Sequence, residues 1–189
     1  ERGTLEAVDG IDFYIRKGEP LGVVGESGCG TTVTALSLLK LVYFPPGRIT
    51  GGEVWFEGEN LLDKPDVYMN KIRGNKISMI FQEPITSLNP LFAVGQQIGE
   101  SLKIHKKMKA AKVRERTIEL VKLVGIPRPE KIVDEYPHQL SGGMRQRIMI
   151  AIALACDPCL LIADEPTTAL DVSIQAQILE LMRELKDKV

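Results

Sequence analysis

The chain has 189 residues, of which 44% are hydrophobic and 26% charged, and its formal net charge is −1. This is the balance of an ordinary globular protein, and a charge near zero gives no general attraction to nucleic acid. No apolar run approaches the roughly 20 residues that a transmembrane helix needs, so we expect membrane attachment only through partner chains. The polar start of the chain and its three cysteines indicate neither an export signal nor a disulfide framework.

The first part of the chain favours strands. Alternating apolar residues predict a half-buried strand, and a continuous apolar run before a Gly-rich turn predicts a strand buried on both faces. A single helix is expected before the sequence Pro45-Pro46-Gly47, which would stop it. The expected strands are 5–15, 20–24, 53–56 and 77–81, the expected helix is 31–41, and a turn is expected at 57–60.

The second part favours helices. Strand signals vanish from 84 to 140, and the only later strand is the buried run 160–163. Strands that alternate with helices imply an α/β fold with a parallel sheet. We therefore expect one domain over 1–189, with a helical subdomain at about 84–156 inserted into the α/β core and an antiparallel part near the N-terminus. The expected helices are 94–108, 113–124, 141–155 and 172–189; the last runs to the end of the chain, as in a C-terminally truncated piece of a larger protein.

A glycine-rich segment lies between the predicted strand 20–24 and the helix 31–41. Its glycines allow backbone N–H groups to turn toward phosphate oxygens, and the helix N-terminus adds a favourable dipole. A purely structural strand-to-helix link is the alternative, but the full spacing of G-x-x-x-x-G-K-[ST] favours a phosphate loop. The predicted nucleotide-binding residues are Gly25, Glu26, Ser27, Gly28, Cys29, Gly30, Thr31 and Thr32.

One position departs from that pattern, because Thr31 stands where it requires lysine. The hydroxyl of Thr32 can still bind magnesium. Thr31 has no ammonium group for the β- and γ-phosphates, and the loss of one charge-assisted hydrogen bond, about 1.5–3 kcal/mol, weakens binding roughly ten- to a hundredfold. Transition-state charge gathers at the same place, so we expect hydrolysis to suffer more than binding.

Two acids follow the predicted strand 160–163. Asp164 can hold Mg²⁺ and Glu165 can polarise an attacking water, although a solvated turn is the alternative. Two glycines also lie at the start of the apolar helix 141–155, and glycine weakens a helix. A reason to have them there is that small residues let an anion approach the backbone of the helix N-terminus closely. The simpler alternative there is a helix start capped by Ser141.

These motifs together resemble the ATP-binding-cassette (ABC) family over essentially the whole chain, with a signature sequence at 140–146. The resemblance implies ATP and Mg²⁺ as cofactors and a head-to-tail dimer of two such domains. It implies that Glu165 and Gln82 are catalytic and that Thr32, Gln82 and Asp164 serve the metal. It also implies that the loop 169–171 contacts the partner domain. For Asp171 in this loop, the alternative role is that of an N-cap for the last helix. The residues implied to close on the partner's ATP are Ser141, Gly142, Gly143 and Gln146.

More narrowly, the segments 82–90, 136–139 and 165–172 resemble the ATPases of oligopeptide and dipeptide importers. Nickel and glutathione importers share much of this pattern. The resemblance implies transmembrane permease subunits as partners, docked near 86–90 and the helical subdomain, and a peripheral place at the cytoplasmic face of the membrane. No nucleic-acid partner is expected. The alternatives are a soluble ABC ATPase that acts on DNA or ribosomes, and a nucleotide sensor without turnover, which Thr31 would suit.

Two further patterns carry weaker hypotheses. The basic run 103–116 is typical of a solvated helix face, with contact to anionic lipid headgroups as the alternative. Cys156 and Cys159 have C-x-x-C spacing, but no second pair completes a zinc site.

Overall fold

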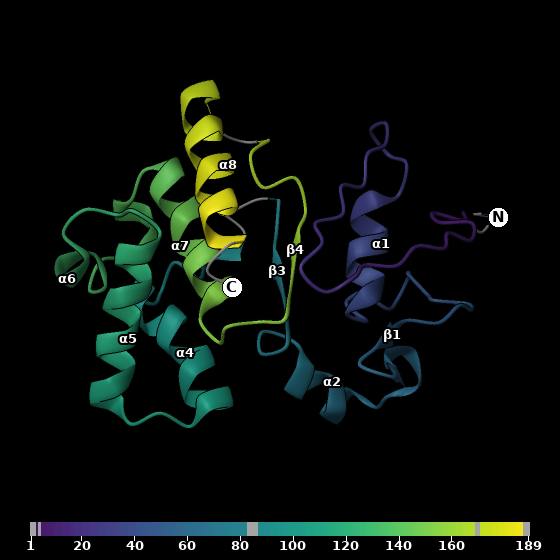
Figure 1. The fold of residues 1–189 in the computed structure, drawn as a ribbon, viewed down its shortest axis with the longest axis horizontal. Helices are drawn as coiled ribbons and strands as arrows, with labels where there is room; N and C mark the ends of the chain where they lie inside the picture. The colour runs from purple at the N-terminus through teal and green to yellow at the C-terminus, as the bar shows by residue number, and fades with distance from the viewer. Residues whose placement is uncertain (1–2, 4, 83–86, 169–170, 187–189) are drawn as a thin grey trace. The chain divides into compact units, whose positions relative to one another are not determined.

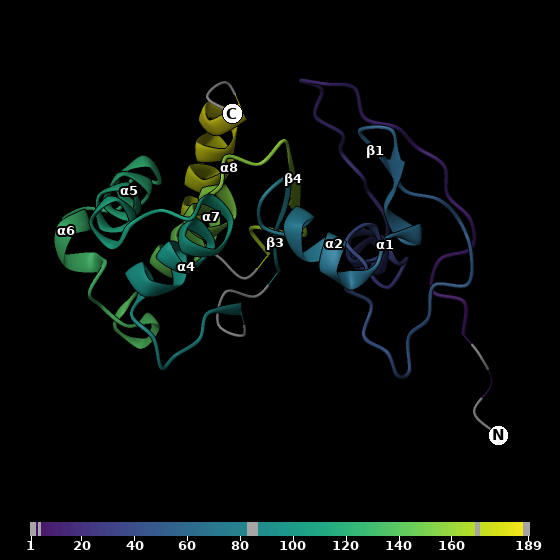
Figure 2. The same ribbon diagram turned by 90° about the horizontal axis from the view of Figure 1, so that it is seen from below.

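The computed structural model describes residues 3, 5–82, 87–168 and 171–186. The chain divides into two compact units, Glu1–Met69 and Asn70–Val189. Figure 1 gives the course of the chain through its helices and strands, and Figure 2 gives the same elements from below. Among the described residues, no helix is long and apolar enough to cross a membrane.

The first unit contains a short β-hairpin. Trp55 pairs with Asn60 and Phe56 with Glu59 in antiparallel register. Glu57 and Gly58 form the two-residue turn with positive φ angles of 51° and 82°, the combination that matches the twist of a tight hairpin. The predicted antiparallel part and its turn are thus confirmed. The elements of this unit are α1 (Thr31–Leu38), β1 (Trp55–Phe56), β2 (Glu59–Asn60), the 3₁₀ helix η1 (Leu61–Asp63) and the first residues of α2 (Asp66–Ile72).

Two predicted strands are wrong. Residues 5–15 and 20–24 form no strand, and within the described part of this unit β1 and β2 are the only strand pair. Val23 and Val24 are 57% and 96% exposed, although the sequence predicted a strand buried on both faces. The physical reason is that an apolar run becomes a central strand only where neighbouring backbone pairs with it, and sequence pattern does not supply that neighbour.

Helix α1 is confirmed but ends three residues before the predicted Leu41, at Leu38. Lys40 has a left-handed backbone (φ 52°), and the N–H of Leu41 returns to the Leu36 carbonyl at 2.9 Å. This closes the helix as a left-handed C-terminal cap does. The Lys40 ammonium then donates to the carbonyls of Leu62 (3.0 Å) and Lys64 (2.8 Å), which fixes the end of α1 against η1.

The second unit is built on a parallel strand pair. Ile77 lies opposite Leu160 and Ile80 opposite Ala163, so the two carboxyl ends meet at one edge. The parallel core and the helical stretch between its two strands agree with the sequence pattern, and Figure 1 shows β3 beside β4. The elements are β3 (Ile77–Ile80), α4 (Val94–Lys106), α5 (Ala110–Leu123), α6 (Pro129–Ile132), the 3₁₀ helix η2 (Pro137–Gln139), α7 (Gly142–Leu154), β4 (Leu160–Ala163) and α8 (Val172–Lys186).

Helix α7 is the centre of this core. It contacts α4, α5 and β3, and Ile148, Ile150 and Ala151 on it are fully buried. A helix surrounded on several sides needs apolar residues all round rather than a single stripe. Helix α8 packs through Ile178 (0% exposed), whereas Leu179 is 51% exposed. Consecutive helical residues point about 100° apart, so Leu181 and not Leu179 shares the buried face.

Two glycines in the first turns of helices have opposite surroundings, which gives a matched stability test. A Cβ on Gly95 of α4 would lie 2.5 Å from the Val133 carbonyl oxygen, whereas a Cβ on Gly142 of α7 would meet nothing within 4 Å. Gly95→Ala is expected to destabilise the fold by about 1–3 kcal/mol through this overlap. Gly142→Ala is expected to be neutral or stabilising by up to about 1 kcal/mol. Urea unfolding of both variants measures this, and equal midpoints would contradict the close contact.

Candidate functional site

The predicted phosphate loop lies in the first unit and reverses direction within a few residues. The Cys29 N–H donates to the Glu26 carbonyl at 3.0 Å, and Gly28 and Gly30 have φ angles of 83° and 90°. Only glycine adopts such angles without strain, which explains the spacing of the motif. A Cβ on Gly30 would also overlap the Ala7 carbonyl oxygen, so this glycine permits a close backbone approach.

The loop leads directly into α1. Gly30 is the N-cap residue, and its carbonyl accepts the first helical bond from Thr34 N at 2.8 Å. Thr31 and Thr32 are therefore the first two residues of α1, and the backbone N–H groups and dipole of a helix start favour an anion there. The predicted residues 25–32 thus form one turn and one helix start, with the short, uncharged Thr31 side chain at the position of the expected lysine.

In the second unit, the parallel strands bring two predicted residues together. Gln82 follows β3 and Glu165 follows β4, and Gln82 Nε2 donates to Glu165 Oε2 at 2.8 Å. They are 83 positions apart in the sequence. The hydroxyl of Thr168 donates to the same Oε2 at 2.9 Å. Sequence reasoning missed Thr168; its only signal was its place three residues after Glu165.

This arrangement suits a carboxylate that works as a base. Two donors on Oε2 fix the carboxylate plane, and within the described part of the chain Oε1 receives no side-chain donor. Glu165 also has a left-handed backbone, with φ 43°. Such a conformation costs a non-glycine residue roughly 1–3 kcal/mol and persists only where its surroundings hold it, which is common at functional sites.

Asp164 precedes Glu165 and lies at the edge of the sheet. Its N–H continues the strand ladder to the Ile80 carbonyl at 3.0 Å, and the residue is 7% exposed. Asp164 and Gln82 both carry oxygen ligands of the kind that Mg²⁺ prefers, and Mg²⁺ is commonly held by one or two carboxylates together with substrate phosphates. Among the described residues no group of three or more His, Cys, Asp and Glu forms a dedicated metal cage. The side-chain oxygens of Asp164 and Gln82 fit magnesium that is brought with a nucleotide.

The predicted signature begins helix α7. Ser141 is its N-cap, and the Ser141 hydroxyl accepts a hydrogen bond from Met144 N at 3.3 Å. The two glycines differ: Gly142 is exposed with open space around it, while a Cβ on Gly143 would lie 2.9 Å from Ile174 Cδ1. Gly143 thus permits close packing of α7 on α8, which lie side by side in both ribbon views. Gly142 leaves the helix N-terminus open to an anion.

Two further predicted residues have distinct places. Gln146 is 1% exposed, and its amide donates to the Pro166 carbonyl at 2.6 Å. Its side chain is therefore buried in the interior of the second unit and not displayed on the surface. Asp171 is exposed at the start of α8, and its carbonyl accepts from Ile174 N and Gln175 N at 2.9 Å each. The Asp171 backbone thus accepts the first hydrogen bonds of α8, which agrees with the alternative role as the residue that caps this helix. The predicted positions 83–86 and 169–170 lie outside the described residues.

The weaker sequence patterns have structural explanations. Arg114 makes a bidentate pair with Asp134, both bonds at 2.8 Å, and this partner lowers the pKa of the Asp134 carboxyl. Arg116 pairs with Asp157 at 3.0 Å. Part of the basic run is thus paired with acids at the surface of the helical region. Cys156 is buried, and this burial raises the pKa of its thiol, as expected for a structural cysteine.

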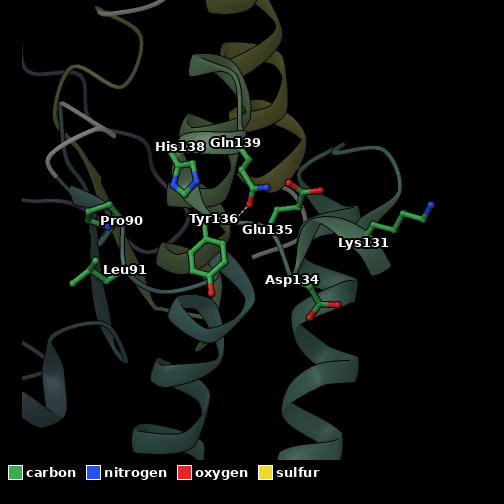
Figure 3. A pocket seen from close by; sticks show the side chains of 8 residues that line it. All are labelled: Pro90, Leu91, Lys131, Asp134, Glu135, Tyr136, His138 and Gln139. Carbon is green, nitrogen blue, oxygen red and sulfur yellow. Dashed lines mark hydrogen bonds between the residues drawn. The ribbon is translucent and has the colours of Figure 1, made fainter.

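An open depression lies beside η2 and α6. Figure 3 shows an apolar side, with Pro90, Leu91 and Tyr136, and a charged side, with Lys131 and Asp134. The Tyr136 ring stacks on His138 with centroids 5.8 Å apart. Leu91 is 79% exposed beside Pro90, so this side of the depression presents apolar surface.

The family model described as "ABC transporter" matches residues 8–168, a range that includes the predicted phosphate loop, the acids after β4 and the predicted signature. The chain belongs to the ABC transporter family. Its most similar solved structures include the dimeric ATP-binding cassette MJ0796 bound to ADP and Pi, with a TM-score of 0.83 and 30% identity over 96% of this chain and 75% of that one.

Curated relatives are more similar in sequence. The Oligopeptide transport ATP-binding protein AppD of Bacillus subtilis is 56% identical over 188 residues, 100% of this chain and 57% of that protein. The Probable peptide ABC transporter ATP-binding protein y4tR of Sinorhizobium fredii is 53% identical over 189 residues, 100% of this chain and 56% of that protein. The chain therefore spans little more than half the length of these relatives.

Proposed function

We propose that this chain is the nucleotide-binding part of a peptide importer, which binds MgATP between two copies of the domain and hydrolyses it. The observation that carries the proposal is the carboxylate of Glu165, held at the end of β4 by Gln82 and Thr168. The family supports ATP as the nucleotide, and the relatives' names support oligopeptides or dipeptides as the cargo.

Each residue of the site has a defined task in this proposal. The backbone of 25–30 and the start of α1 would bind the phosphates, and Thr32, Gln82 and Asp164 are the residues that would hold Mg²⁺. When bound, Mg²⁺ neutralises negative charge on the phosphate oxygens. Glu165 orients the attacking water and accepts its proton at Oε1, while Gln82 and Thr168 keep the carboxylate in place. Thr31 makes this site weaker than one with lysine, so we propose reduced activity for the chain as it stands.

Dimer closure would complete each site. Ser141 and Gly142 begin α7 with an exposed surface, where backbone N–H groups can approach the γ-phosphate held by the other copy. Asp171 would contact the same partner. The solved relative MJ0796 is a dimer bound to ADP and Pi, which supports this arrangement.

The permease subunits need a docking surface at the cytoplasmic face of the membrane. We propose the depression of Figure 3, because Pro90 and Leu91 offer apolar area beside Tyr136 and the charges of Lys131 and Asp134 offer orientation. It adjoins the segment 86–90 that the sequence pointed to. In this proposal the helical subdomain at about 84–156, which includes the basic run 103–116, couples nucleotide binding to the permease subunits.

The test is ATP-dependent dimerisation of the chain carrying Thr31→Lys and Glu165→Gln, which is expected to bind ATP without turning it over. Light scattering should show that the molar mass doubles with MgATP and keeps the value of a monomer with MgADP. Adding Gly142→Glu, at a position with space for a side chain, should block the dimer by placing a negative charge against the phosphate. No change of mass with MgATP would contradict the proposal.

A further inference from the structure

Three consecutive residues of α7 each form a hydrogen bond to a different segment that connects longer elements. Each donates a side-chain hydrogen bond to a backbone carbonyl, so the helix fixes three connections at once. Such bonds restrain loops because a buried carbonyl that loses its donor is costly. The bonds run from Arg145 Nε to the Pro137 carbonyl (2.8 Å), from Gln146 Nε2 to the Pro166 carbonyl (2.6 Å) and from Arg147 Nη1 to the Val124 carbonyl (2.6 Å).

Gln146 stands out among the three. It is the buried one, 1% exposed, and its acceptor Pro166 directly follows Glu165. The amide group therefore reaches the backbone that carries the base, whereas Gln82 and Thr168 bond to the carboxylate itself. Because Glu165 has a left-handed backbone (φ 43°), its position depends on restraints of this kind.

The same helix begins with the signature residues. Ser141 caps α7, and Gln146 lies about one turn and a half further along the same rigid helix. A displacement of the helix N-terminus is therefore passed to the Pro166 carbonyl without an intervening flexible segment. In the proposed dimer, Ser141 meets the nucleotide of the partner, whereas Glu165 acts on the nucleotide of its own chain.

We propose that Gln146 is a positioning residue, which ties the Glu165 loop to α7 and so links the two nucleotide sites of a dimer through one hydrogen bond. The inference rests on the proposed function. Closing of Ser141 on the partner's γ-phosphate would shift α7, and the bond to Pro166 would bring Glu165 into line in the other site. In this proposal Gln146, buried and bonded to the Pro166 carbonyl, does not contact the partner's nucleotide, which departs from the contact that the family resemblance implied.

The first part of the test measures the loop without nucleotide, in the chain as it exists. Gln146→Met keeps the length of the side chain and removes the donor. Hydrogen exchange of the Thr168 amide, which is bonded to the Glu165 carbonyl at 3.3 Å, is expected to speed up about three- to tenfold, the range set by one net hydrogen bond. The matched control is Gln177→Met on α8, whose glutamine is exposed and bonds to Arg147 instead.

The second part measures turnover in chains that carry Thr31→Lys. Gln146→Met is expected to lower kcat about tenfold while KM for ATP stays unchanged, because binding groups are untouched. Gln146→Glu should be equally poor at about pH 8 but recover part of its kcat near pH 6. Burial raises the pKa of a carboxyl, and the protonated group can again donate to the Pro166 carbonyl. A general packing defect would not respond to acid in this way.

The outcomes separate the two ideas. If the amide exchange rate and kcat of Gln146→Met both match those of the Gln177→Met control, the inference is overturned. A Gln146→Glu chain that gains nothing in acid relative to Gln146→Met overturns it as well. If the Thr31→Lys parent fails to bind or hydrolyse ATP, the proposed function is contradicted before any change is made at Gln146. The linking role of Gln146 is then contradicted as well, whatever exchange rate the Thr168 amide shows.

Discussion

Replacing Thr31 with lysine is expected to tighten the binding of MgATP by about ten- to a hundredfold, the worth of one charge-assisted hydrogen bond of about 1.5–3 kcal/mol. Position 31 is the first residue of α1, directly after the turn formed by Gly28 and Gly30. An ammonium group on a long side chain from this position can fold back over the loop to the β- and γ-phosphates. Titration calorimetry at fixed Mg²⁺ measures the change.

The matched control is Thr31→Met, which supplies length without charge. It should bind MgATP no better than the parent chain, because the expected gain comes from the ammonium group. Equal affinities for the lysine, methionine and threonine chains would contradict the assignment of 25–32 as the phosphate loop. A gain shared by lysine and methionine would mean that packing and not charge governs the site.

Replacing Glu165 with glutamine is expected to lower kcat for ATP hydrolysis by at least about a hundredfold, since a general base contributes roughly 10²–10⁴ to the rate. The comparison is made in the Thr31→Lys chain, where turnover is easiest to measure. The amide keeps the shape of the carboxylate but cannot accept a proton. Gln82 and Thr168, which donate to Glu165 Oε2, can still donate to the amide oxygen, so the fold should be unchanged.

Phosphate release measures the rate, and calorimetry should give an unchanged affinity for MgATP. The control is Glu115→Gln, at an exposed glutamate of α5, which should leave kcat unaltered. A kcat of Glu165→Gln within about threefold of its parent would remove Glu165 from the role of base. A loss of affinity in step with kcat would instead give Glu165 a part in binding the nucleotide.

The helices α1, α4, α5, α7 and α8 and the local geometry of the motifs were predictable because they depend on neighbours in the sequence, whereas the short helices α2 and α6 were not predicted. Ser141 caps α7, β4 spans 160–163 as expected, and Glu57-Gly58 makes the hairpin turn. Helix spacing and turn chemistry act over a few residues, so pattern suffices for them. The parallel core also followed from the alternation of strands and helices, and family resemblance supplied the rest of the architecture.

Contacts between residues far apart in the sequence could not be predicted from local pattern. The bond between Gln82 and Glu165 depends on the pairing of β3 with β4, and no local pattern specifies a strand's partner. For the same reason the run 20–24 was predicted as a central strand and is not one. Sequence pattern alone was enough to predict the phosphate loop, the acids and the signature, because each is a run of neighbouring residues. Tertiary contacts decided that Thr168 holds Glu165 and that Gln146 turns inward to Pro166, because these contacts join loops from separate elements.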